Sequence, residues 1–312
     1  MPYPQLSVML INFSASDPGS WQPLLDGARA ADEAGVDRLA VSDHVVFGEN
    51  LEAYGDARVG GIEGGRQPTG PDGMWLEPLT LLSVVAGVTS HARLATGILQ
   101  AALRRPAVLA KAAATLDVLS GGRLDLGVGV GWQREEYDAA GLSFEDRGRL
   151  LNQTLAVCQA LWRQERADFD GDGLRFEGIH AMPKPLQPGG VPIWVSGTLN
   201  DRVIERLARF GDGWIPWGPI ARDPTTGIAR VREALEAAGR DAAGFQVQGR
   251  LPVVKGPDGS IDLDRTMEGV PALAEAGITD FRAPVSITLE PGATADALAE
   301  MVSVFRQAVG RS

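Results

Sequence analysis

Of the three histidines in this chain of 312 residues, His44 is the one placed where chemistry is most easily done. It directly follows Asp43, at the end of an apolar run in the stretch LAVSDHVVFGEN (residues 39–50). An imidazole ordinarily changes charge near pH ~6.5, so it can accept or release a proton during a reaction. We expect Asp43 to orient His44 or to cap the following turn. His44 is the candidate catalytic residue; the alternative is a histidine that only packs or bonds locally.

A second stretch, LGVGVGW (residues 126–132), places Gly127, Gly129 and Gly131 at alternate positions before Trp132. Alternate residues of a strand share a face, and glycines leave that face bare, so a flat ring can approach the backbone. The pattern is not a dinucleotide fingerprint, because the last glycine is misplaced and no helix follows it. Tight packing inside a barrel is an equal alternative to ligand contact.

The remaining candidates for metal or thiol chemistry are weak. No two histidines have the spacing of metal ligands, and His91 and His180 look structural. Cys158 is the only cysteine, which excludes an internal disulfide and a cysteine-based metal site. Its helical spacing from neighbouring apolar residues predicts a buried, packing role. We therefore expect no metal.

The net charge and the sequence composition limit the kinds of partner that this protein can bind. The formal charge of −11 argues against nucleic acid or an anionic membrane as the main partner. The stretch MPYPQLSVML lacks the basic start and apolar core of a signal peptide, and no apolar run approaches the ~20 residues that span a bilayer. The expected location is cytoplasmic, and the expected partner is a small-molecule substrate.

Strand-like and helix-like runs must position these residues, and the two kinds alternate along the whole chain. The predicted strands are residues 7–13, 38–43, 94–99, 124–130, 192–196, 213–217, 245–254 and 280–285. The predicted helices include residues 77–89, 106–119, 146–162, 201–210, 225–238 and 293–309. Eight strand–helix units of about 39 residues each in a chain of 312 fit an α/β fold, the (β/α)8 TIM barrel, better than two domains.

Two insertions interrupt the predicted single domain, which spans residues 1–312. Residues 48–73 contain eight glycines and follow the strand that carries His44. Chemistry in such barrels lies where strands lead into helices, so this segment is expected to close over a ligand, with a mobile surface loop as the alternative. Residues 163–190 contain DFDGDGLRFEG, which reads as a hairpin.

Several of these stretches together resemble the luciferase-like monooxygenase superfamily, particularly its coenzyme F420-dependent branch. The likeness covers nearly the whole chain. It is carried by VSDHV (41–45), LATGILQAALRRPAVLAKAAATLDVLSGGR (94–123), LGVGVGWQREEYDAAGLSFEDRG (126–148), PKPLQPGGVPIWVSG (183–197) and RFGDGW (209–214). The middle stretches are long and specific, whereas SDH or GDGW alone would prove little.

The resemblance implies a bacterial luciferase-like barrel that binds a flavin or 5-deazaflavin in its C-terminal mouth. In the family, the third strand ends in a bulge, often with a non-proline cis peptide, that backs the ring. That bulge would fall at Thr96, Gly97, Ile98, Leu99 and Gln100. The candidate contacts of the ring system are Thr96, Gly97, Ile98 and Gln100 of this bulge, together with Asp43, Gly129, Gly131 and Trp132.

The phosphate of the cofactor is held in this family largely by backbone groups after the later strands. Ser196, Gly197 and Thr198 lie between the fifth strand and a helix that begins near Asp201. Small residues expose N–H groups there, and the helix N-terminus favours an anion. Asp212 would repel phosphate, so its expected role is structural.

One departure from the family bears on the substrate. The F420-dependent sugar-phosphate dehydrogenases carry a glutamate acid at the fourth-strand position that Trp132 occupies here. An indole can wall a pocket but cannot transfer a proton at neutral pH, so an apolar or conjugated substrate fits better. The neighbouring Glu135 and Glu136 are expected to be solvated or to cap the turn.

The leading interpretation is an F420-dependent oxidoreductase that transfers a hydride between the deazaflavin and an unidentified organic substrate. The alternative is an FMN-dependent monooxygenase that uses reduced flavin and O2; a third reading is a cofactor-binding barrel without catalysis. A separate F420 or flavin reductase would be the electron source. Relatives commonly form homodimers. Basic groups at the mouth, with Arg104 or Arg105 as candidates, would favour F420, which carries an acidic tail.

Overall fold

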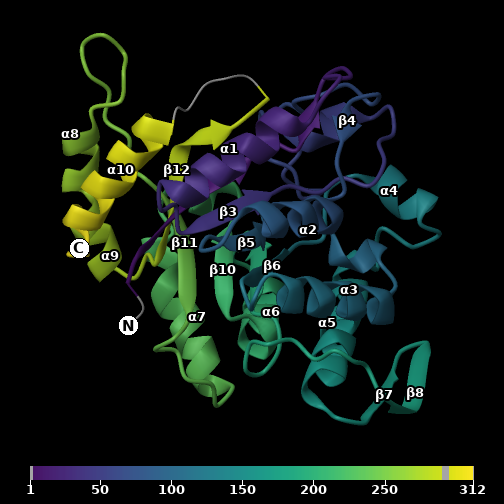
Figure 1. The fold of residues 1–312 in the computed structure, drawn as a ribbon. Helices are drawn as coiled ribbons and strands as arrows, with labels where there is room; N and C mark the ends of the chain where they lie inside the picture. Colours follow the sequence, from purple (N-terminus) through teal and green to yellow (C-terminus); the bar gives the residue numbers. More distant parts are fainter. Residues whose placement is uncertain (1–2, 290–294, 312) are drawn as a thin grey trace.

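The computed structural model describes residues 3–289 and 295–311 and shows a closed barrel of eight parallel strands (Figure 1). Around the barrel the order is β1-β12-β11-β10-β9-β6-β5-β3, and pairing of β1 with β12 and β3 closes the ring. The barrel strands are β1 (Gln5–Leu10), β3 (Arg38–Val41), β5 (Arg93–Thr96), β6 (Leu124–Val128), β9 (Ile193–Gly197), β10 (Gly213–Pro216), β11 (Gln246–Arg250) and β12 (Asp280–Ile287). The predicted fold class is confirmed.

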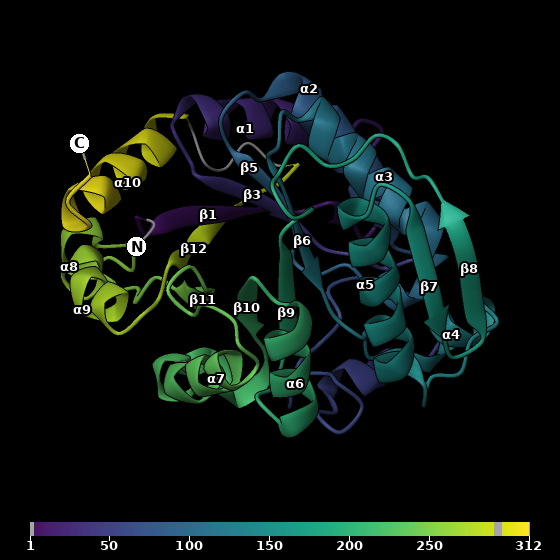
Figure 2. The same cartoon turned by 90° about the horizontal axis from the view of Figure 1, so that it is seen from below.

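Helices surround the strands, as the view from below shows (Figure 2). They bury apolar faces against the outside of the barrel, and their outer faces are mostly polar, although Val84 of α2 and Val108 and Leu119 of α3 are exposed. The helices are α1 (Gln22–Glu33), α2 (Pro78–Val88), α3 (Pro106–Leu119), α4 (Arg134–Ala139), α5 (Arg147–Arg163), α6 (Asp201–Phe210), α7 (Thr225–Ala237), α8 (Leu263–Glu268), α9 (Val270–Glu275) and α10 (Ala295–Ala308). No helix in the described part of the chain is both long and apolar enough to cross a bilayer.

Most predicted elements agree with the observed ones to within a few residues. The largest differences are at strand ends: β11 stops at Arg250 where the prediction ran to residue 254, and β5 stops at Thr96, directly before the cis peptide Gly97–Ile98. Glu77, predicted inside a helix, instead caps α2 by accepting a hydrogen bond from the backbone N–H of Thr80 at 2.7 Å. The predicted start of the last helix at residue 293 lies outside the described residues.

The two inserted segments differ in structure. The segment at residues 163–190 contains the predicted hairpin, made of β7 (Ala167–Gly171) and β8 (Leu174–Ile179), beside α5. Residues 48–73 contain a short 3-10 turn at Leu51–Gly55 and lead into β4 (Met74–Trp75), which pairs with β2 (Phe13–Ser14). The indole N–H of Trp217 donates to the carbonyl of Gly60 at 2.9 Å, which ties this segment to the end of β10.

The inside of the barrel is layered. At its floor, Arg38 bridges Asp125 and Asp280, all three of them buried. Immediately above, Met9, Ala40 and Ala95 form a small apolar cluster. Short side chains in this second layer leave the upper barrel unfilled, so a cavity opens above them.

Candidate active site

A cavity of about 1310 Å³ opens at the C-terminal ends of the barrel strands. It continues into a groove lined by residues of α5 and α6. Pockets for small ligands typically measure 300–1,000 Å³, so the space suffices for a flavin-sized cofactor together with a substrate. The residues that the sequence singled out as catalytic or cofactor-binding line this cavity, except Leu99 of the bulge, which is fully buried; their roles stay predictions.

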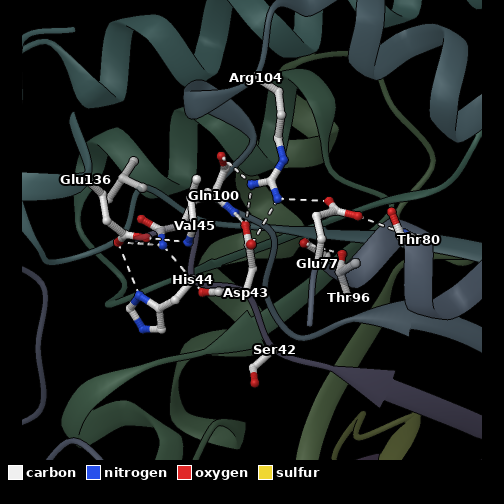
Figure 3. A network of polar contacts seen from close by, with 12 residues as sticks. Ser42, Asp43, His44, Val45, Glu77, Thr80, Thr96, Gln100, Arg104 and Glu136 are labelled. Atoms are coloured by element: carbon white, nitrogen blue, oxygen red, sulfur yellow. Dashed lines mark hydrogen bonds and ion pairs between the residues drawn. The ribbon is translucent and has the colours of Figure 1, made fainter. Parts of the chain in front are cut away.

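At the wall of the cavity, just beyond the end of β3, His44 is held by a buried carboxylate (Figure 3). Its Nδ1 lies 3.2 Å from Oε2 of Glu136, a residue of α4 that is 1% exposed. The same carboxylate accepts hydrogen bonds from the backbone N–H of Val45 and from Nε2 of Gln100, both at 2.8 Å. A carboxylate at Nδ1 favours the tautomer with its proton on Nδ1, which leaves Nε2 to exchange a proton with a bound molecule.

Two expectations, one about Glu136 and one about Asp43, were therefore wrong. Glu136 is neither solvated nor a cap of the turn, and it is Glu136 rather than Asp43 that contacts the His44 ring. Sequence reasoning expected no helix after Gly131 and so missed α4; the one usable signal was the aromatic Tyr137 directly after Glu136, which indicates that part of this segment is buried. Glu135 is exposed, and Tyr137 is buried beside Glu136.

Asp43 anchors a second arm of the network instead (Figure 3). Both of its carboxylate oxygens bind Arg104, and one also accepts the backbone N–H of Gln100 at 2.8 Å. Burial raises the pKa of Asp43, and the Arg104 guanidinium opposes that rise. Arg104 also binds Glu77 at 3.0 Å, so it is already neutralised. The expectation that Arg104 is available to an anionic cofactor tail is wrong; Arg105 is exposed and does not line the cavity.

The alternating glycines Gly127, Gly129 and Gly131, in and directly after β6, do not leave a bare face. A Cβ on Gly127 would lie 1.9 Å from the carbonyl oxygen of Thr96, and one on Gly129 would lie 2.8 Å from the Ile98 side chain. At Gly131, where φ is +71°, it would meet the Gln100 side chain at 1.8 Å. The space is filled by the bulge that follows β5, so these glycines admit that bulge into the barrel rather than a ring directly.

That bulge has the shape that the family resemblance implies. The peptide between Gly97 and Ile98 is cis, and Leu99 resumes backbone pairing by donating to the carbonyl of Gly127 at 2.7 Å. Gly97 and Ile98 line the cavity above the apolar cluster of Met9, Ala40 and Ala95. A flat, uncharged surface of this kind fits the ring of a flavin or a deazaflavin.

The opposite part of the mouth offers groups that suit a phosphate. Strand β9 ends with Ser196 and Gly197, and Thr198 follows it. Gly218, just after β10, packs against Thr198: a Cβ on Gly218 would lie 2.9 Å from the Thr198 hydroxyl. Asn200 caps α6 directly behind them. The Thr198 hydroxyl already donates to the carbonyl of Trp217 at 3.2 Å, which leaves the Ser196 hydroxyl and backbone N–H groups at a helix N-terminus as the donors; these residues fit a phosphate-bearing cofactor.

Aromatic rings form the wall around His44, and we call Phe13, Phe47, Trp75 and Trp132 the aromatic cluster. The His44 ring centroid lies 4.5 Å from that of Phe47, 4.9 Å from Trp75 and 5.6 Å from Trp132. Phe13 stacks on Trp75 at 4.2 Å through the pairing of β2 with β4. Sequence reasoning predicted only Trp132 here, because β2 and β4 are too short to show a strand pattern.

Comparisons with known proteins agree with this architecture. The family model described as luciferase-like monooxygenase matches residues 6–260. The F420-dependent glucose-6-phosphate dehydrogenase of Kineococcus radiotolerans is 31% identical over 273 residues, which cover 86% of this chain and 70% of that relative. An F420-dependent secondary alcohol dehydrogenase solved with an F420-acetone adduct superposes with a TM-score of 0.71 at 17% identity, covering 98% of this chain and 100% of that one. A long-chain alkane monooxygenase gives 0.77 at 16% identity, covering 100% and 92%. At these identities the structural likeness supports the fold alone.

Proposed function

This chain belongs to the luciferase-like monooxygenase family and is an oxidoreductase of that family, and we propose that it uses coenzyme F420 to transfer a hydride to or from an organic substrate. Relatives that are F420-dependent dehydrogenases, at about the 30% level of identity, support the choice of cofactor. The observation that carries the proposal is the buried Glu136–His44 pair beside the cis-peptide bulge, at the wall of the cavity.

Each part of this site has a distinct task in the proposal. A bound F420 would supply a two-electron hydride donor or acceptor, while the protein must manage the accompanying proton. His44 binds the substrate oxygen through Nε2 and gives or takes that proton. Glu136 holds the imidazole in position and stabilises its charged form. The aromatic cluster excludes water from the reacting end of the substrate.

A second candidate uses the same cavity with FMN, as a monooxygenase. The apolar surface formed by Met9, Ala40 and Ala95 below Ile98 accepts a flavin ring as readily as a deazaflavin ring. In that reading reduced flavin and O2 are the reactants, and a separate reductase supplies the electrons. The two candidates differ in cofactor affinity, which can be measured without a known substrate.

Separate titrations of the purified protein with F420 and with FMN test the proposal. We expect F420 to bind at least tenfold more tightly, a difference of ~1.4 kcal/mol. Equal affinities, or tighter binding of FMN, would reject the F420 assignment and favour the monooxygenase. Enones, quinones and secondary alcohols, screened with F420 in the matching redox state, would then identify the reaction.

A further inference from the structure

Two arginines at the barrel mouth lie side by side on neighbouring strands. Arg250 of β11 and Arg282 of β12 are paired in register, and both line the cavity. Two residues earlier, Gln248 and Asp280 are also paired, and Nε2 of Gln248 donates to Oδ2 of Asp280 at 2.7 Å inside the barrel. Because alternate residues of a strand share a face, Arg250 and Arg282 also face the interior, one layer above.

These two cations have no acidic partner among the described residues. The Asp280 carboxylate beneath them is already bound by Arg38 at 2.5 Å and by Gln248. Burial lowers the pKa of Arg282, and the like charge of Arg250 lowers it further. Arg282 is half-buried and Arg250 is exposed, so the like charge between them disfavours mainly the charged form of Arg282, and an anion bound between them would offset it.

Tyr54 brings a hydroxyl to the same part of the cavity. It belongs to the inserted segment at residues 48–73, lines the cavity, and lies with its ring centroid 5.4 Å from that of Trp132. Burial raises the pKa of Tyr54, and the charges of Arg282 and Arg250 oppose the rise. Tyr54, Arg250 and Arg282 thus line one cavity, and at neutral pH the Tyr54 hydroxyl can donate a hydrogen bond.

We propose that the substrate is an organic anion, and that Arg250 and Arg282 bind its carboxylate or phosphate group together with Tyr54. Guanidinium groups match the paired oxygens of such anions and bind them through two parallel hydrogen bonds. The apolar remainder of the molecule extends toward the aromatic cluster and places its reacting carbon near His44. This inference deepens the proposed function and rests on it only for the identity of the reacting end.

Binding of simple aromatic anions to the protein tests the proposal without turnover. The probes are benzoate, phenyl phosphate and the neutral benzamide, measured by calorimetry in a phosphate-free buffer. We expect at least one anion to bind at least tenfold more tightly than benzamide, and its affinity to fall as NaCl is raised; the order of the two anions identifies the preferred group. Equal binding of all three probes would overturn the proposal.

Substitutions assign the effect to the arginines. We expect Arg282→Met to lose tenfold or more of the anion affinity, Arg282→Lys to retain part of it, and Arg250→Met to show a smaller loss. The matched control is Arg202→Met, which removes an exposed arginine that lines the same cavity from α6 and should bind the anion normally. Because Arg282 is unpaired, Arg282→Met should keep or raise the Tm. A lower Tm with unchanged anion binding would show a structural role and overturn the proposal.

Titration of the same variants with F420 separates this inference from the proposed function. We expect Arg282→Met to bind F420 like the wild-type protein. If it loses F420 binding and keeps benzoate binding, the arginines belong to the cofactor site and the substrate inference is wrong, while the F420 assignment stands. If neither the wild-type protein nor any variant binds F420, but benzoate binding still depends on Arg282, the F420 assignment is wrong and the anion site is supported.

Discussion

The floor and the mouth of the barrel both contain buried carboxylates, but their charges are satisfied to different extents. At the floor, Asp280 accepts hydrogen bonds from Arg38, Ser7 and Gln248, and Asp125 is bound by Arg38 and Arg93. Burial alone would lower the pKa of Arg38, but Asp280 and Asp125 hold it above its ordinary value. The charges of Arg38, Asp125 and Asp280 therefore neutralise one another, and Nη2 of Arg38, which has no hydrogen-bond partner, still lies 3.0 Å from the Asp125 carboxylate.

The mouth is incomplete by contrast. Glu136 is satisfied by three donors, yet one of them is His44, whose second ring nitrogen has no partner within the described residues. Arg250 and Arg282 likewise have no acidic partner in the described part of the chain. The difference teaches that buried charge marks a functional site only where its hydrogen-bonding capacity is left open.

The largest expected effect comes from His44→Asn at the mouth. The amide keeps the shape and part of the hydrogen bonding but cannot titrate, so turnover should fall by roughly 10²–10⁴-fold while cofactor affinity changes little. The pH–rate profile should also lose the limb that the imidazole supplies. Steady-state kinetics with the substrate found by the screen measures both effects. Full turnover across the pH range would make His44 a structural neighbour of the ring.

Arg38→Met tests the floor and should act on stability alone. It leaves Asp280 and Asp125 buried without their shared cation, which should lower the free energy of unfolding by ~3–5 kcal/mol. Urea denaturation at neutral pH measures this change. The control, Arg149→Met, removes an exposed ion pair with Asp172 and should have little effect. A mild effect at Arg38 would show that the floor network is not needed for folding.

Arg104→Met probes a pair at the mouth that resembles those of the floor. Asp43 would be left buried without its cation, so the free energy of unfolding should fall by about 3 kcal/mol at neutral pH. Burial already raises the pKa of Asp43, and loss of Arg104 raises it further. A raised pKa favours the protonated acid in the folded state, so the deficit should shrink as the pH is lowered toward 4. Urea titrations at pH 7 and at pH 4.5 compare the two; a constant deficit would contradict this account.

Glu136→Gln should have the smallest effect of the four substitutions, and it separates the role of Glu136 from that of His44 at the mouth. The glutamine side chain has nearly the same size as glutamate, but it lacks the negative charge that orients and stabilises the imidazole. Turnover should therefore fall by up to ~10²-fold, which is the usual effect of misplacing a catalytic group. The pH–rate profile should move toward lower pH, because a neutral partner stabilises a protonated ring less. Glu135→Gln is the matched control, since Glu135 is exposed one residue away. Equal kinetics for the two variants would limit Glu136 to a structural role.

By itself the sequence determined the barrel and the region of the site. Alternation of apolar runs with helical patterns is local, and helix α3 (Pro106–Leu119) has the predicted bounds because proline and glycine signals mark its ends. The Asp43–His44 pair was found because a polar pair at the end of a strand is visible without tertiary information. The cis peptide at Gly97–Ile98 was expected only through the family resemblance, since no local pattern encodes it.

Only the tertiary structure decided which charged groups meet. Glu136 reaches His44 across 92 residues of sequence, and Arg104 reaches Asp43 across 61. Arg250 and Arg282 become neighbours through the register of β11 with β12, which nothing in either segment specifies. Hydrophobic periodicity tells which face of a helix or strand is buried. It does not tell which donor binds a buried carboxylate, because the donor must lie within about 3 Å, and that distance depends on how all the strands of the closed barrel are arranged.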